Sequence, residues 1–237
     1  MTPRAARLPW VALAVSFLAS GAAQCGSLSL TPVRAELKPG QRTTNFELKN
    51  PTDQAIVVQA EPRKWSQDGG RDNVVADNGL IVAPPVIKLP PQGRQVVRVA
   101  LRNPQSATVE QSYRVSFREV PPETPDVSTG VRTIVELSVP VFVAPDKPIS
   151  DPPSLSCHVA GSGALDITRN GPVHYRFTRL RSVGSGDQRV LHEGQVYVLA
   201  GASRRVNLPS NTTIRAGDTL AFDAGGRDAQ TCTVASR

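Results

Sequence analysis

Apolar and polar residues alternate along most of the chain with the period of two that is typical of β-strands. Near the start, for example, Phe46 and Leu48 alternate with Asn45 and Glu47. Such segments recur at the spacing of a β-sandwich, and no stretch shows the long apolar period of 3.6 residues that marks an amphipathic helix. The pattern therefore predicts an all-β protein.

About seven strands are expected in the first half of the chain, because turn-forming residues interrupt the alternating segments at regular intervals. These strands are expected at residues 27–37, 42–50, 55–65, 79–89, 94–102, 112–120 and 131–143. A polar loop is expected at residues 66–73, where the sequence reads SQDGGRDN. This set of strands is enough for one sandwich of about 100 residues.

A proline-rich stretch at residues 144–153 divides the chain, since four prolines in ten residues make a stiff connection. A second set of short alternating segments follows it. We therefore expect two immunoglobulin-like β-sandwich domains arranged with a cleft between them. Their expected bounds are residues 24–145 for the first domain, 146–153 for the linker and 154–237 for the second domain.

Residues 1–23 have the composition of a secretory signal peptide. Arg4 and Arg7 supply a basic start, residues 10–20 are apolar, and residues 21–23 are small, as a cleavage site requires. The apolar run is too short for a transmembrane helix, and no later run is long and apolar enough to span a bilayer. The sequence thus predicts an exported protein with no membrane span.

The formal net charge is +7, and two arginines of the leader account for part of it. The other basic residues are scattered rather than gathered in a block, and aromatic residues do not interleave with them. This distribution argues against binding to nucleic acid and is compatible with an acidic protein partner.

No motif in the sequence points to catalysis or to a cofactor. The three histidines, His158, His174 and His192, lie in the second half without the spacing of metal ligands. The sequence has no nucleophile elbow, zinc-binding helix motif, paired-cysteine motif or phosphate loop. We therefore expect a binding protein rather than an enzyme, with no catalytic residue, metal or cofactor.

The three cysteines have different expected fates. Cys25 follows Gln24 rather than a small residue, which argues against a lipid-modified N-terminus. Cys157 and Cys232 flank the second domain and are either two buried thiols or a disulfide between its first and last strands. An oxidising compartment favours the disulfide.

The segment VRTIVELSVPVFV, at residues 131–143, carries an unusually long apolar row with Pro140 in the strand. Proline lacks an N–H group and is confined to edge strands or bulges. An apolar edge strand is an aggregation hazard unless the edge is a binding site that joins another protein's sheet. We expect the odd-numbered residues to be lent to such a partner: Val131, Thr133, Val135, Leu137 and Val139.

The same row has a second interpretation, in which it forms the inner face of the chain's own sandwich. Ile134 and Phe142 would then point outward. A shift of one residue in strand register exchanges the two faces, so both interpretations stay open at the level of sequence.

Four segments of the first half carry motifs in a recognisable order. They are an opening strand with an arginine (28–37), an asparagine-led turn before a strand ending in tryptophan (48–65), a proline pair followed by a turn (83–99), and YRVSFREVPPE (113–123). In these segments the chain resembles the PapD-like periplasmic chaperones of the chaperone–usher pathway. Two further segments, 137–145 and 197–206, resemble the archaic branch of that family, which serves spore-coat-U-type pili.

The resemblance implies a periplasmic chaperone that binds and stabilises pilin-like subunits. In this family the chaperone lends the subunit a donor strand and delivers it to an outer-membrane usher for fibre assembly, a known case of β-augmentation. Residues 131–143 would be the donor strand. Self-association of the chain when it is free of subunit is left open.

The resemblance also places Arg34 at the family's cleft arginine, which holds the C-terminal carboxylate of the subunit. A guanidinium suits bidentate carboxylate binding. The lysine that completes this anchor in the better-known classes is Pro140 here. A second cation is expected from Arg98 or Arg118, on neighbouring strands.

Two other classes of function stay open. One is a secreted two-domain surface or adhesion module that binds a finished ligand, which would be expected to carry a sorting or assembly tail. The other is a secreted enzyme, which would need a cluster of polar residues at a cleft.

Overall fold

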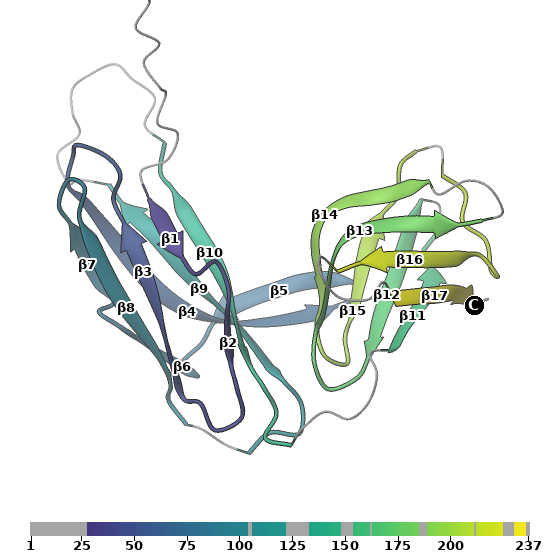
Figure 1. Cartoon of the computed structure of the whole chain (residues 1–237), viewed down its shortest axis with the longest axis horizontal. Coiled ribbons are helices and arrows are strands. Elements are labelled where there is room, and N and C mark those ends of the chain that lie inside the picture. The colour runs from purple at the N-terminus through teal and green to yellow at the C-terminus, as the bar shows by residue number, and fades with distance from the viewer. Residues whose placement is uncertain are drawn as a thin grey trace, which may run out of the picture.

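The computed structural model describes residues 28–103, 106–121, 133–147, 154–161, 163–184, 189–210, 212–224 and 230–235. These residues form seventeen strands and no helix, and the strands build two sandwiches (Figure 1). The expected all-β fold with two immunoglobulin-like domains is therefore confirmed. No helix that could cross a membrane occurs in the described part of the chain. The expected leader, Cys25, Val131 and most of the expected linker lie outside the described residues.

Two sheets form the first sandwich. The strands of one are β1 (Ser29–Thr31), β3 (Thr43–Lys49), β6 (Leu80–Ala83) and β8 (Arg94–Leu101). The strands of the other are β2 (Ala35–Leu37), β4 (Ile56–Asp68), β5 (Arg71–Ala76), β7 (Val86–Leu89), β9 (Gln111–Val120) and β10 (Glu136–Val143). Their orders are β1-β3-β8-β6 and β2-β10-β9-β4-β5, with β7 paired to β4.

The core of the first sandwich is made by the inward rows that the alternation predicts. Phe46 and Leu48 of β3 are fully buried, as are Val97 and Val99 of β8, and the residues between them are exposed. The Phe46 ring meets the ring of Phe117 on β9 edge-on, with their centres 5.8 Å apart. The two sheets therefore pack face to face through one apolar layer.

Two segments expected to be single strands are each divided between the two sheets. Residues 27–37 form β1 in one sheet and β2 in the other, with Pro32 between them. Residues 79–89 form β6 and β7 in the same way, on either side of Pro84 and Pro85. Because proline has no N–H for a ladder bond, these positions suit a chain that leaves one sheet and crosses to the other.

The polar loop expected at residues 66–73 is instead the end of a long hairpin. β4 continues to Asp68 and β5 begins at Arg71, with Gly69 and Gly70 between them. Both glycines have positive φ, at 55° and 79°, a conformation that glycine adopts readily. The hairpin reaches the second sandwich (Figure 1), so its polar residues serve a contact between domains.

Seven strands form the second sandwich. They are β11 (Ser154–Val159), β12 (Ala164–Asn170), β13 (Tyr175–Val183), β14 (Val190–Val198), β15 (Ser203–Asn207), β16 (Thr219–Asp223) and β17 (Gln230–Ala235). Their order is β14-β13-β16-β17-β11-β12-β15. Ile167, Phe177 and Phe222 are fully buried between the strands and form the centre of its core.

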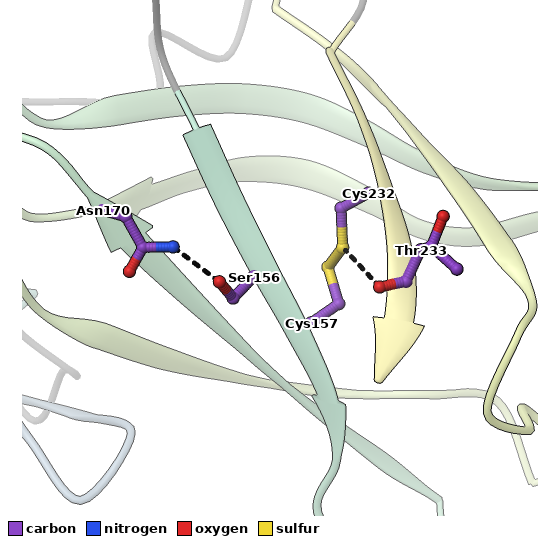
Figure 2. The surroundings of a disulfide bond; sticks show 5 residues. All are labelled: Ser156, Cys157, Asn170, Cys232 and Thr233. Carbon is purple, nitrogen blue, oxygen red and sulfur yellow. Dashed lines mark hydrogen bonds between the residues drawn. A yellow bond between two sulfur atoms is a disulfide. The ribbon is translucent and has the colours of Figure 1, made fainter. Parts of the chain in front are cut away.

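A disulfide joins Cys157 of β11 to Cys232 of β17, as Figure 2 shows. The two strands pair in parallel, and Cys157 lies opposite Val234. Beside the bond, the side-chain amide of Asn170 donates to the hydroxyl of Ser156 (Figure 2). The first and last strands of the second sandwich are therefore covalently linked.

Candidate functional site

One edge of the first sandwich is only partly covered. β10 has β9 along one side, but β2 pairs with its other side only at Val141, Phe142 and Val143. The chain before β2 has crossed to the other sheet, where β1 pairs with β3. Within the described residues, no strand pairs with residues 136–140 on this side. We call residues 136–140 the open half of β10.

Backbone groups of the open half point alternately towards β9 and towards the open side. The amide of Glu119 donates to the carbonyl of Val135 at 2.9 Å, which identifies the odd-numbered residues as those that bond to β9. Glu136 and Ser138 therefore direct their N–H and C=O groups to the open side. Pro140 is also even-numbered, so its backbone nitrogen faces the open side. The lack of an N–H there therefore costs no hydrogen bond to β9.

The odd-numbered row passes from the core to the surface along the strand. Val139 is 6% exposed and lies in the protein's own core. Leu137 and Val135 are half-buried against that core, and Thr133 is exposed. Val131 lies outside the described residues. The row is thus the inner face of the sandwich at one end and reaches the surface at the other.

Three arginines lie in one row across the outer face of this sheet. Arg63 of β4 pairs with Arg114 of β9, and Arg114 pairs with Pro140 of β10. The parallel register of β2 and β10, extended by one residue, places Arg34 beside Pro140 on its other side. Because like charges at neighbouring positions repel, such a row favours an anion above it.

Arg114 occupies the centre of the row. Its Nε donates to the hydroxyl of Ser138 and its Nη2 to the Ser138 carbonyl, both at 2.8 Å. Its guanidinium carbon lies 4.7 Å from the centre of the Trp65 ring, which is a cation–π contact. Burial lowers the pKa of Arg114, and the negative charge of Asp72 acts in the opposite direction. The guanidinium is therefore partly removed from water.

The other two arginines of the row are held by exposed carboxylates. Arg34 lies 3.1 Å from Glu36, and Arg63 lies 3.1 Å from Glu61. The Nε of Arg63 is buried and has no hydrogen-bond partner among the described residues. Exposed ion pairs contribute only about 0–1 kcal/mol, so these arginines exchange partners at little cost.

Arg118 and Arg98, expected to supply a second cation, lie on different sheets. Arg118 shares the outer face of β9 with Arg114. Arg98 lies on the outer face of β8, in the other sheet, because its neighbours Val97 and Val99 fill the core. The fold therefore places Arg118 on the same face as the row, opposite Glu136 and further along β9 than Arg114, and leaves Arg98 on the far side of the sandwich.

Arg114 is the residue of this row that the sequence did not single out. Its place beside Pro140 depends on the pairing of β9 with β10, and alternation within one strand carries no information on that register. The available signal was that Arg114 and Arg118 lie on the same face of one predicted strand.

The far end of β10 is buried in the contact between the two sandwiches. Phe142 packs with Trp65 of β4 and with Leu199 of the second sandwich. The ring of His174 stacks on Phe142 with their centres 3.7 Å apart, and its Nδ1 lies 2.8 Å from the Glu110 carboxylate. His174 thus contributes to the contact between the domains. The open half of β10 ends at Pro140, two residues before Phe142 in this contact.

The β4–β5 hairpin makes a second contact between the sandwiches. The amide of Arg205 on β15 donates to the Gly70 carbonyl at 2.8 Å, and Arg204 forms an ion pair with Asp72 at 2.9 Å. A Cβ at Gly70 would lie 2.8 Å from the Cβ of Arg205, so this approach requires glycine. A backbone hydrogen bond and an ion pair therefore join the hairpin to the second sandwich.

The described residues contain no group of three or more His, Cys, Asp or Glu side chains that could hold a metal ion. The site offers backbone groups with which no strand pairs in the described part of the chain, half-buried apolar side chains and a row of cations. These features suit the binding of an extended chain that ends in a carboxylate.

Comparison with known protein families gives a match over residues 27–148 to the pili and flagellar-assembly chaperones, in their PapD N-terminal domain. The match spans just over half of the chain and includes every strand of the first sandwich. A comparison with curated proteins gives no match.

Several solved structures have a similar fold. A pre-assembly complex of CsuC and CsuE, a chaperone and a tip adhesion subunit of archaic Csu pili of Acinetobacter baumannii, has a TM-score of 0.71 at 19% identity, over 89% of this chain and 100% of that chain. The SafA pilin–SafB chaperone complex of Salmonella enterica has a TM-score of 0.64 at 18% identity, over 90% and 98%. The CupB2 chaperone of Pseudomonas aeruginosa has a TM-score of 0.59 at 18% identity, over 87% and 100%.

Proposed function

The chain belongs to the family of PapD-type pili and flagellar-assembly chaperones, and we propose that it binds pilin-like subunits, keeps them folded and delivers them to an outer-membrane usher. The open half of β10 carries this proposal, because it combines an unpaired strand edge with an apolar row that reaches the surface. The signal-like N-terminus supports a location in the periplasm. The fold shared with a complex from archaic pili supports the archaic branch.

In this proposal the subunit adds a strand to the open half of β10. Glu136 and Ser138 offer the N–H and C=O groups for that pairing, and each new ladder bond contributes about 1 kcal/mol. Pro140 ends the run of donors close to where β2 begins to cover the edge. The pairing is therefore confined to the segment that β2 leaves uncovered.

The lent side chains are Thr133, Val135 and Leu137, with Val131 preceding them. Full burial of an exposed valine or leucine contributes roughly 1.5–3 kcal/mol, and half-buried side chains gain only part of that amount. Val139 would have to leave the chaperone's own core to be lent, so we place it at the boundary of the donor set. The row then continues from the core of the chaperone to the side chains that the subunit would bury.

We place the terminal carboxylate of the subunit above Pro140, between Arg34 and Arg114. Neighbouring strands are about 4.8 Å apart, so these arginines, one strand to either side of β10, start about 10 Å from each other. In this proposal both guanidinium groups turn towards the same point above β10. Arg118 adds positive charge along the same face, whereas Arg98 lies too far round the sandwich to share this anchor.

Co-expression in the periplasm with pilin-like subunits from neighbouring genes tests the proposal. Val135→Arg places a charge in the lent row, and we expect it to abolish recovery of soluble subunit. Ile134→Arg is the matched control, because Ile134 is the adjacent residue, is 42% exposed and lies outside that row. We expect it to carry the subunit as the wild type does.

Thermal unfolding of both variants without subunit shows whether the chaperone itself stays folded. If Val135→Arg is folded and still recovers the subunit, the row is not lent and the proposed mechanism is wrong. If neither the wild type nor Ile134→Arg recovers any subunit, the chaperone function itself is contradicted.

A further inference from the structure

Arg114 contacts the open half of β10 at Ser138. Its Nη2 donates to the carbonyl of Ser138 and its Nε to the hydroxyl, each at 2.8 Å. Ser138 is even-numbered, so this carbonyl is one of the groups that an added strand would use. The guanidinium therefore covers a backbone acceptor on the open edge.

The surroundings of Arg114 favour an exchange of partners. Both hydrogen bonds go to uncharged groups of Ser138. Arg63, directly opposite on β4, brings a second positive charge, which the negative charge of Asp72 offsets only in part. Burial lowers the pKa of Arg114, which reflects the cost of holding its charge in this place. A carboxylate is a stronger partner for a guanidinium than a hydroxyl or a carbonyl. An arriving carboxylate is thus expected to draw Arg114 away from Ser138.

Two other features of the open half discourage pairing with a wrong strand. Glu136 brings a carboxylate, which accepts a hydrogen bond from the hydroxyl of Ser116. Pro140 lacks the N–H that would point to the open side. Charged side chains and prolines commonly protect edge strands from pairing. Both features belong to β10 itself, whereas the Arg114 contact is made by a long side chain from the neighbouring strand.

We propose that Arg114 guards the open half of β10: in the free chain it opposes pairing with a second copy of this chain, and the terminal carboxylate of a subunit releases it. Two copies that pair edge to edge about a two-fold axis place both Arg114 side chains on one face of the joined sheet, where their charges repel. The release by a subunit rests on the proposed function, whereas the protection of the free chain does not.

The guarding role also restricts which strand can be added. A residue that lies opposite Ser138 on an added strand has its side chain on the same outer face, against the guanidinium of Arg114. A strand that brings a carboxylate to this face compensates the charge, and a strand without one leaves it buried and poorly paired. Arg114 is therefore a specificity-determining residue of the edge as well as a cover for it.

Sedimentation equilibrium of the mature chain without any subunit tests this inference. We expect the dimer dissociation constant of Arg114→Ala to be at least ten times lower than that of the wild type. Arg114→Lys keeps a charge but loses the two-bond contact with Ser138, so we expect an intermediate constant. Arg63→Ala is the matched control, because it removes a positive charge from the same face without touching Ser138.

A second substitution shows whether the dimer forms through the open edge. Ser138→Pro, added to Arg114→Ala, removes an N–H that points to the open side and leaves the bonds to β9 in place. We expect the dissociation constant to return to the wild-type value. The inference is overturned if the Arg114 variants associate no more tightly than Arg63→Ala, or if the dimer persists after Ser138→Pro.

Arg114→Lys keeps the test decisive if Arg114→Ala does not fold. Because no subunit is present, failure of this test leaves the co-expression result of the Val135 and Ile134 variants untouched. Failure of the co-expression test likewise leaves the association measurement intact, so the two proposals fail separately.

Discussion

Asn50 is fully buried and holds together two turns at one end of the first sandwich. Its Nδ2 donates to the carbonyls of Gln54 at 2.7 Å and Pro90 at 2.9 Å. Its Oδ1 accepts from the amide of Thr52 at 3.0 Å and from the hydroxyl of the same residue at 2.7 Å. The side chain therefore replaces water for several backbone groups at once.

Asn50→Ala is expected to lower the free energy of unfolding by about 3 kcal/mol, because each buried group left without a partner costs about 1–3 kcal/mol. Urea unfolding followed by tryptophan fluorescence measures the change. Asn45→Ala is the control, since Asn45 is exposed on the outer face of β3, and we expect a change within about 0.5 kcal/mol. Equal losses in both variants would contradict the role given to Asn50.

For single residues, the sequence identified the odd-numbered apolar row of β10 but not how deeply each side chain in it is buried. Alternation assigns Val135 and Val139 to one face, whereas their burial depends on what covers each end of the strand. Val139 is part of the core of the sandwich, whereas Val135 is only partly buried against that core. Arg114 was missed for the related reason that its neighbours are set by pairing between strands.

In the second sandwich the first strand, β11, pairs with the last strand, β17. The disulfide between Cys157 and Cys232 links positions 75 residues apart in the sequence. A cross-link over a loop of this length restricts the unfolded chain strongly and stabilises the fold by about 4 kcal/mol in the chain-entropy model.

The double substitution Cys157→Ala and Cys232→Ala is expected to lower the free energy of unfolding of the second sandwich by about this amount. Native-state hydrogen exchange measures it by strand: amides of β16 should lose protection, and amides of β3 in the first sandwich should not. Reduction of the wild type should reproduce the loss. An unchanged exchange rate in β16 after either treatment would show that the bond does not stabilise this domain.

At the scale of strands the sequence predicted where alternation occurs but not where a strand changes sheet. Residues 27–37 and 79–89 each alternate well enough to be read as one strand, yet Pro32 and the pair at Pro84 mark crossings. The hairpin at residues 66–73 was missed because its polar side chains contact the second sandwich rather than an apolar core.

For the whole molecule, composition and spacing were sufficient to predict two sandwiches, and the contacts between them were not predictable. Trp65, Phe142 and His174 come from separate strands or loops, and only the tertiary fold brings them together. The hairpin tip adds the close approach of Gly70 to Arg205. These contacts place the two sandwiches relative to each other.

Gly70→Val is expected to change the relative orientation of the sandwiches while each keeps its fold. The added side chain would meet Arg205, and the hairpin tip would have to move away from β15. Gly40→Val is a closely matched control, since both glycines have a φ of 79° but nothing lies within 4 Å of a Cβ at Gly40. Residual dipolar couplings of the two domains give the orientation, and an unchanged orientation in Gly70→Val would contradict this account of the contact between the domains.

Amide hydrogen exchange in β10, with and without a bound pilin-like subunit, shows whether a subunit adds a strand to the open half. The amides of Leu137 and Val139 point to β9 and should be protected in both states, whereas those of Glu136 and Ser138 point to the open side. We predict that subunit binding slows exchange at Glu136 and Ser138 at least a hundredfold. If a tightly bound subunit leaves these two amides exchanging as fast as in the free chain, no strand has been added to the open half of β10, and the account is wrong.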